Sequence, residues 1–260
     1  MAYQLGCFNR PWNQLSYAEA LRGTAAAGFA YTGLMRQQGE LLIGCESDDN
    51  QVAYVNNAVA AAGLQMSTVL GTFDLSDCVD RAVAELGMLL RKCAAVGAEY
   101  FLSCGVADEA RRQAYYEVMR QGAGIGAELG VTVTLKPHGG ISMHGADLLA
   151  AVEAIAHPNF GIYYDPGNML YYGGHDPVAE ARLVAPHVVG ICVKDCSGPQ
   201  EGVELLPGEG AVDFVSVFDA LREGGFDHGP VLIECLGGEG YQDITSRARQ
   251  TYGFVKHLLS

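Results

Sequence analysis

The stretch Thr134–Gly140 (TLKPHGG) places a lysine where an apolar run gives way to a glycine-rich loop. Three later apolar runs also end in polar groups, at Asp165, at Lys194-Asp195 and at Glu234. In a (β/α)8 barrel, the active site is built from residues at the carboxyl ends of the strands. These four strand ends therefore predict an α/β barrel whose mouth holds cations among carboxylates.

Short apolar runs alternate with amphipathic or alanine-rich stretches along the whole chain. The predicted strands are Gln4–Phe8, Ala30–Leu34, Gln65–Leu70, Tyr100–Cys104, Thr132–Lys136, Gly161–Asp165, Val188–Lys194 and Val231–Glu234. The predicted helices are Ser16–Ala27, Gln51–Ala62, Ser76–Val96, Asp108–Leu129, Ala146–Ile155, Pro177–Val184, Val212–Glu223 and Asp243–Leu259. Strands this apolar have no wet face, which indicates a parallel sheet covered by helices. With no linker between the units, we expect one (β/α)8 TIM barrel spanning residues 1–260.

The composition excludes several classes of partner. A formal charge of −14 and a pI near 4.8 repel phosphate backbones, so we expect no nucleic-acid binding. The N-terminus has no basic region before an apolar run, and no stretch approaches the roughly 20 apolar residues of a membrane helix. The eight cysteines form no CxxC pair, as in a reduced protein. We expect a cytoplasmic protein without a membrane partner; its oligomeric state stays open, a homo-oligomer being one option.

Asp165 and Glu234 each follow a buried strand directly. A carboxylate there loses its hydration and needs a cation, hydrogen-bond donors or a metal in return. Lys136 ends another such strand, so we expect its ammonium to face the barrel mouth and pair with one of these acids. His138, two residues later, is a candidate acid or base.

Other strand-end residues are candidates for substrate binding. Asn168 offers a donor and an acceptor to a hydroxylated ligand, and Lys194 and Asp195 lie at the mouth after the seventh strand. Arg10 and Trp12 follow the first strand and could form a cationic and aromatic wall for a sugar or phosphate. Each has a structural alternative: a turn position, a local ion pair or packing of the first loop.

Five stretches, in this order, resemble the xylose-isomerase-like TIM-barrel superfamily over essentially the full length. The opening LSYAEALRGTAAAGFAYTGL resembles that family's first helix and second strand. KPHGG resembles that family's Glu-Asn-His-Gly-Gly, YYDPGN its Asp-Thr-Gly-His/Asn, and VVGICVKD its His-x-His-x-Lys-Asp. The segment from PGEGAVDF to GPVLIE resembles its last strand–helix unit. The family contains sugar-phosphate isomerases and epimerases, ketose 3-epimerases, and inosose and dehydroshikimate dehydratases.

The resemblance implies a divalent metal (Mn, Zn, Co or Mg) held by Glu, Asp, His and Glu from the fifth to eighth strands. Asp165 and Glu234 match two of these ligands, whereas Lys136 and Cys192 stand at the other two positions. The net charge of three carboxylates and one divalent ion is −1. The net charge of Lys136, Asp165 and Glu234 without a metal is also −1. We therefore favour a metal-independent site slightly over a metal site. A zinc site of Asp165, Cys192, Glu234 and His138 remains the alternative.

The leading hypothesis is a carbohydrate isomerase, epimerase or lyase that removes a proton next to a carbonyl of a sugar or polyol derivative. Glu234 would be the base, Lys136 and His138 the electrophilic and acid groups, and Asp165 their orienting partner. A Schiff base on Lys136 is a variant of this chemistry. The rival hypothesis is a non-catalytic barrel that binds a sugar or metabolite after losing the family metal.

Overall fold

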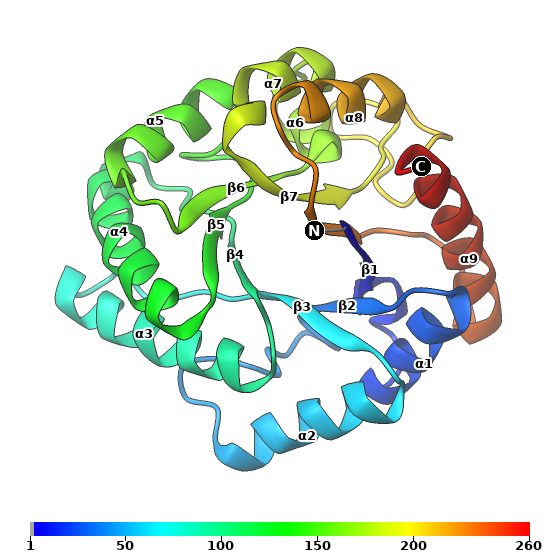
Figure 1. The fold of residues 1–260 in the computed structure, drawn as a ribbon, viewed down its shortest axis with the longest axis horizontal. Coiled ribbons are helices and arrows are strands. Elements are labelled where there is room, and N and C mark those ends of the chain that lie inside the picture. The colour runs from blue at the N-terminus through cyan, green and yellow to red at the C-terminus, as the bar shows by residue number, and fades with distance from the viewer. Residues whose placement is uncertain (1–2) are drawn as a thin grey trace.

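The computed structural model describes residues 3–260 and confirms the barrel. The strands are β1 (Tyr3–Phe8), β2 (Tyr31–Leu34), β3 (Gln65–Leu70), β4 (Tyr100–Ser103), β5 (Thr132–Leu135), β6 (Phe160–Tyr164), β7 (Val188–Val193) and β8 (Gly229–Ile233). All pair in parallel in chain order, and β1 closes the ring against β8. Figure 1 shows this ring surrounded by helices, with the C-terminal helix beside α1.

The helices follow the strands on the outside of the ring (Figure 1). They are α1 (Tyr17–Ala27), α2 (Asp49–Ala61), α3 (Val79–Ala95), α4 (Arg112–Leu129), α5 (Gly145–Ile155), α6 (Pro166–Gly173), α7 (Pro177–Val184), α8 (Phe214–Glu223) and α9 (Gly240–Leu258), with short 3-10 turns η1 (Arg10–Trp12), η2 (Glu109–Arg111) and η3 (Ala185–His187). Within residues 3–260, no helix is both long enough and apolar enough to cross a membrane.

Local sequence signals account for the ends of these helices. Ser16 caps α1, because its side chain accepts from the Glu19 backbone while the Glu19 side chain accepts from the Ser16 backbone. Five glycines that follow helices α1 to α4 and α8 all adopt positive φ, a conformation that costs other residues more. They are Gly28, Gly63, Gly97, Gly130 and Gly225.

The barrel interior alternates large and small residues. Phe8, Leu102, Tyr163, Cys192 and Leu232 belong to one buried cluster inside the ring. Gly33 on β2 leaves room for the Phe8 ring, since a Cβ there would lie 2.3 Å from it. The interior is therefore packed, and ligands can approach only at the ends of the strands.

Two elements differ from the sequence prediction. Between the strand predicted to end at Asp165 and the helix predicted to begin at Pro177, the structure forms an additional helix, α6, which begins with Pro166 and is capped by Asp165. Proline at the first helical position and aspartate before it are ordinary helix-start signals. The predicted helix from Asp108 begins as the 3-10 turn η2 before α4.

Candidate active site

A cavity of about 760 Å³ opens at the carboxyl ends of the strands. Its walls come chiefly from the segments after β1, β2 and β8, and its floor includes Lys136 and Glu234. The charged residues that line it, together with one histidine, are Arg10, Arg36, Lys136, His138, Glu204, Glu234 and Glu239. Glycines at 237, 238 and 240 keep the wall after β8 thin.

Lys136, Asp165 and Glu234 meet at the floor as a buried ion group. The Lys136 ammonium lies 2.9 Å from Asp165 Oδ2 and donates a hydrogen bond to Glu234 Oε2. All three side chains are buried. Asp165 Oδ1 accepts from the Asn168 backbone N–H at 2.8 Å, so this carboxylate both caps α6 and holds the lysine.

Two further cations contact the same glutamate through its other oxygen. Arg10 Nη1 lies 3.5 Å and Lys194 Nζ 3.8 Å from Glu234 Oε1. Lys194 also donates to Asn168 Oδ1 at 2.6 Å, and Asn168 Nδ2 donates to the Pro137 carbonyl at 2.7 Å. Through these hydrogen bonds and that with Asp165, Asn168 connects the residues that follow β5, β6 and β7 just beneath the cavity.

The charges in this group stabilise one another. Burial alone would raise the pKa of Glu234, but Lys136, Lys194 and Arg10 together hold it well below the ordinary 4.5. Burial likewise works against the Lys136 ammonium, yet Asp165 and Glu234 raise its pKa well above 10.5. The contribution of Glu234 to stability is thus present above pH 4.5 and lost on acidification, while that of Lys136 is lost only in strong alkali. Both groups are ionised at neutral pH.

His138 lies at the cavity mouth on the β5–α5 loop. Its Nε2 is 3.1 Å from the Tyr172 hydroxyl, and the two rings pack with centroids 4.8 Å apart. The residue is exposed overall, but partial burial against Tyr172 and the nearby Lys136 charge lower its pKa below 6.5. At neutral pH, His138 is therefore an uncharged imidazole that can donate or accept a proton.

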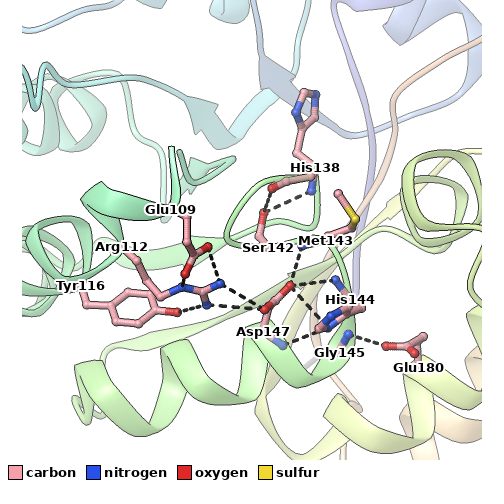
Figure 2. Close-up of polar contacts among 11 residues, drawn as sticks. Glu109, Arg112, Tyr116, His138, Ser142, Met143, His144, Gly145, Asp147 and Glu180 are labelled. Atoms are coloured by element: carbon pink, nitrogen blue, oxygen red, sulfur yellow. Dashed lines mark hydrogen bonds and ion pairs between the residues drawn. The ribbon is translucent and has the colours of Figure 1, made fainter. Parts of the chain in front are cut away.

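The loop that carries His138 is anchored at both ends, as Figure 2 shows. The backbone N–H of His138 donates a hydrogen bond to Ser142 Oγ at 3.3 Å. At the start of α5, Asp147 accepts from the backbone of Met143 and pairs with Arg112 at 3.4 Å. The imidazole points away from this second polar cluster, so the cluster positions the loop without engaging the ring.

The structure does not bring Trp12 and Asp195 to the cavity. The Trp12 ring is fully buried and donates to Thr245 Oγ1 at 3.3 Å, so it packs η1 against α9. The Asp195 carboxylate is fully buried as well and accepts four backbone N–H groups, which fold the β7–α8 loop around it. The donors are Cys196, Gly208, Gly210 and Val212, at 2.9–3.1 Å.

Sequence reasoning missed several lining residues. Cys104 directly follows β4, and Arg36 lies two residues after the end of β2, so the rule that located the other candidates could have found them. Glu204 belongs to the long β7–α8 loop and Leu236 to the segment after β8. No local pattern marks these two positions, because only the closed barrel brings their loops over the floor.

Within residues 3–260, one group of side chains could hold a metal: Asp165, Cys192 and Glu234. One ligand atom of each lies within 4.8 Å of the others. The Lys136 ammonium already contacts both carboxylates, and burial raises the pKa of the Cys192 thiol well above 9.0, which disfavours the thiolate that a metal requires. As arranged here, with Lys136 charged, these side chains do not fit a divalent ion.

Comparison with known proteins identifies the family. The family model described as xylose isomerase-like TIM barrel matches residues 21–255. Inosose dehydratase of Geobacillus kaustophilus is 26% identical over 133 residues, covering 45% of this chain and 42% of that protein. L-ribulose-5-phosphate 3-epimerase UlaE of Escherichia coli is 32% identical over 109 residues, 42% of this chain and 37% of that protein. The matched regions thus span only about two fifths of these relatives.

A solved structure reproduces the whole fold. D-allulose 3-epimerase from Methylomonas sp. in complex with D-allulose superposes with a TM-score of 0.77, covering 98% of this chain and 97% of that chain at 18% identity. This likeness confirms the predicted barrel, and the family match confirms the predicted kinship. The chain belongs to the xylose isomerase-like TIM-barrel family.

Proposed function

We propose that the protein is a carbohydrate-active isomerase or lyase that removes a proton next to a carbonyl of a sugar or polyol derivative. The observation that carries the proposal is an ionised carboxylate, Glu234, on the cavity floor within contact of three cations. Such chemistry needs a base beside the reacting carbon and a positive charge beside the oxygen that becomes an enediolate. Two of the relatives named above are, by name, a dehydratase of an inosose and an epimerase of a sugar phosphate.

The two oxygens of Glu234 have separate roles in this proposal. Oε2 accepts the Lys136 hydrogen bond, whereas Oε1 makes longer contacts with Arg10 and Lys194 and accepts a weak hydrogen bond from the Cys235 thiol at 3.8 Å. Oε1 is therefore the oxygen available to take a substrate proton. The Lys136 ammonium, oriented by Asp165, would donate a charge-assisted hydrogen bond to the developing oxyanion. His138 would return a proton or protonate a leaving hydroxyl.

The arrangement favours one-base chemistry over a two-base epimerase. Epimerisation by two bases needs a second proton-accepting group on the opposite face of the substrate carbon. Among the described residues, the other carboxylates lining the cavity, Glu204 and Glu239, are both exposed on its rim. Isomerisation and β-elimination need only one base, so the proposal places these ahead of epimerisation.

Hydrogen exchange tests the proposal whatever the final product of the reaction is. Incubation in D2O with a panel of ketoses, inososes and 3-keto-sugars should give deuterium incorporation next to the carbonyl of one class, read by NMR. Exchange needs proton removal only, so it also detects partial reactions. Calorimetric binding without exchange or turnover would instead support a sugar-binding barrel, the rival that the lysine among the carboxylates suggests.

We also propose that this chemistry proceeds without a bound metal, because Lys136 occupies the space between the two carboxylates. Elemental analysis of the purified protein should give well under one divalent ion per chain. Exchange activity should be unchanged after treatment with chelator. One tightly held ion per chain, lost together with activity when Asp165 is replaced by asparagine, would contradict this part of the proposal.

A further inference from the structure

His138 uses only one of its two ring nitrogens for contacts within the protein. Its Nε2 lies 3.1 Å from the Tyr172 hydroxyl. Within residues 3–260, this is the one hydrogen bond of the His138 side chain, so Nδ1 has no partner there. The His138 side chain lines the cavity, whereas Tyr172 does not belong to the cavity wall. A substrate therefore reaches the imidazole directly, and Tyr172 can act on the substrate only through that imidazole.

Tyr172 is held in place by the helix that carries it. The residue belongs to α6, which Asp165 caps and which the Asn168 side chain ties to the segment after β5. The Tyr171 ring packs edge-on against the Tyr172 ring, with centroids 4.9 Å apart. The Tyr171 carbonyl also accepts hydrogen bonds from the backbone and side chain of Gln200, at 3.0 and 3.1 Å. The floor of the cavity and the β7–α8 loop thus both hold the helix that presents the hydroxyl to His138.

The chemistry of the two groups decides which of them donates. A phenol is a stronger hydrogen-bond donor than the N–H of a neutral imidazole, and an imidazole nitrogen is a stronger acceptor than a phenol oxygen. Burial raises the pKa of Tyr172 above 10, although the charges of Lys194 and Lys136 oppose this, so the phenol keeps its proton at neutral pH. The Tyr172 O–H therefore donates to Nε2, and the ring proton of His138 is left on Nδ1.

We propose that Tyr172 is a positioning residue that fixes His138 as the Nδ1–H tautomer and replaces the proton that His138 gives to the substrate. This inference rests on the proposed function, in which His138 supplies a proton. A neutral imidazole on its own is a poor acid, because the loss of its N–H proton would leave an imidazolate. A proton that arrives at Nε2 as another leaves Nδ1 avoids that anion.

The transfer balances as a relay of two protons. The Nδ1–H bond of His138 breaks as its proton passes to the substrate, and the Tyr172 O–H bond breaks as a new Nε2–H bond forms. His138 ends as the other neutral tautomer, and the negative charge rests on the Tyr172 oxygen. The charges of Lys194 and Lys136, which lower the pKa of Tyr172, would stabilise this phenolate until water returns the proton.

The tautomer of His138 can be measured without any substrate. The 15N chemical shift of a protonated ring nitrogen differs from that of an unprotonated one, and the signals of His138 among the seven histidines are those missing from His138→Gln. The parent, at a pH where the imidazole is neutral, should carry the His138 proton on Nδ1. Tyr172→Phe keeps the ring but lacks the hydroxyl, so it should shift His138 toward the Nε2–H form that free histidine prefers. Tyr171→Phe, which removes a hydroxyl one residue away, should leave the tautomer unchanged.

Turnover gives a second readout that a purely structural role would not move. Tyr172→Phe should lower kcat by about 10–100-fold with KM changed less than about threefold, since His138 stays in place but loses its proton supply. Deuterium exchange next to the carbonyl should persist, because Glu234 removes that proton without help from Tyr172. Adding Tyr172→Phe to His138→Gln should have little further effect, because the two residues act as one unit. Tyr171→Phe should retain both turnover and exchange.

Failure of this inference differs from failure of the proposed function. A parent His138 protonated on Nε2, or an Nδ1–H tautomer that persists in Tyr172→Phe, would overturn the inference whether or not a substrate is found. An unchanged kcat in Tyr172→Phe would overturn it as well. Control of the tautomer by Tyr172, without exchange or turnover on any substrate, would support the positioning of His138 and reject the proposed enzyme.

Discussion

Glu234→Gln is expected to lower the rate of hydrogen exchange and turnover by about 10²–10⁴-fold, the usual contribution of a positioned general base. The amide keeps the shape of the side chain but cannot accept the substrate proton. Ligand affinity should change far less than the rate, because the amide still occupies the floor of the cavity. The measurement is kcat, with deuterium exchange under saturating substrate as its chemical counterpart.

The matched control is Glu204→Gln, which removes a carboxylate from the rim of the same cavity. That side chain is exposed, and its loss should change kcat by less than about threefold, within the range of surface effects. Because Glu234 is paired with Lys136, the melting temperature of both variants must be recorded. Full turnover in a folded Glu234→Gln protein would remove Glu234 from the mechanism.

The cations around Glu234 also limit the pH dependence of the reaction. They hold its pKa below 4.5, so the base form persists through the neutral range and the acid limb of kcat/KM should fall below pH 4.5. A carboxylate with so low a pKa is a weak base.

The barrel could be predicted from the sequence because its signals are local. Apolar runs such as that ending at Ile233 have no polar face, and glycines such as Gly130 end helices at positive φ. The positions of Lys136, Asp165 and Glu234 at strand ends follow from the same pattern, since parallel strands deliver their carboxyl ends to one edge. The structure accordingly brings these three side chains into contact.

The remaining features depend on contacts between distant segments. Trp12 is an aromatic residue after a strand, and only its hydrogen bond with Thr245, 233 residues away, shows that it packs against α9 instead of facing the cavity. Asp195 likewise follows a strand, but the loop that returns at residues 208–212 takes up its carboxylate. Residues that occupy the same kind of position after a strand can therefore face the cavity or be buried away from it, depending on which loops fold over them.

Lys136→Met should destabilise the fold by about 3–5 kcal/mol, the typical cost of removing one partner from a buried ion group. Methionine has nearly the same length but no charge, so Asp165 and Glu234 would share a buried site without the cation between them. One of the two should then bind a proton near neutral pH, because like charges in a low-dielectric site repel strongly. Denaturant unfolding at several pH values measures both effects.

The sign of the pH dependence distinguishes this account from simple loss of packing. In the parent, the depressed pKa of Glu234 means that its contribution to stability is lost on acidification. In Lys136→Met a carboxyl pKa is raised above its unfolded value, so the stability it contributes should be greatest at low pH and fall as pH rises through neutrality. Lys92→Met, which removes a surface ammonium 3.6 Å from Asp49, should show neither effect.

Lys136→Glu should convert the ion group into a metal-dependent one. Without added metal, three carboxylates would repel one another and the protein should melt at a lower temperature than the parent. A divalent ion such as Mn²⁺, at about 100 times its dissociation constant, would restore about 2.7 kcal/mol, or several degrees of melting temperature. The parent should show no such response, because its Lys136 ammonium already neutralises the site. If the parent gains as much from Mn²⁺ as Lys136→Glu does, the lysine does not stand in for a metal and the charge argument fails at its first step.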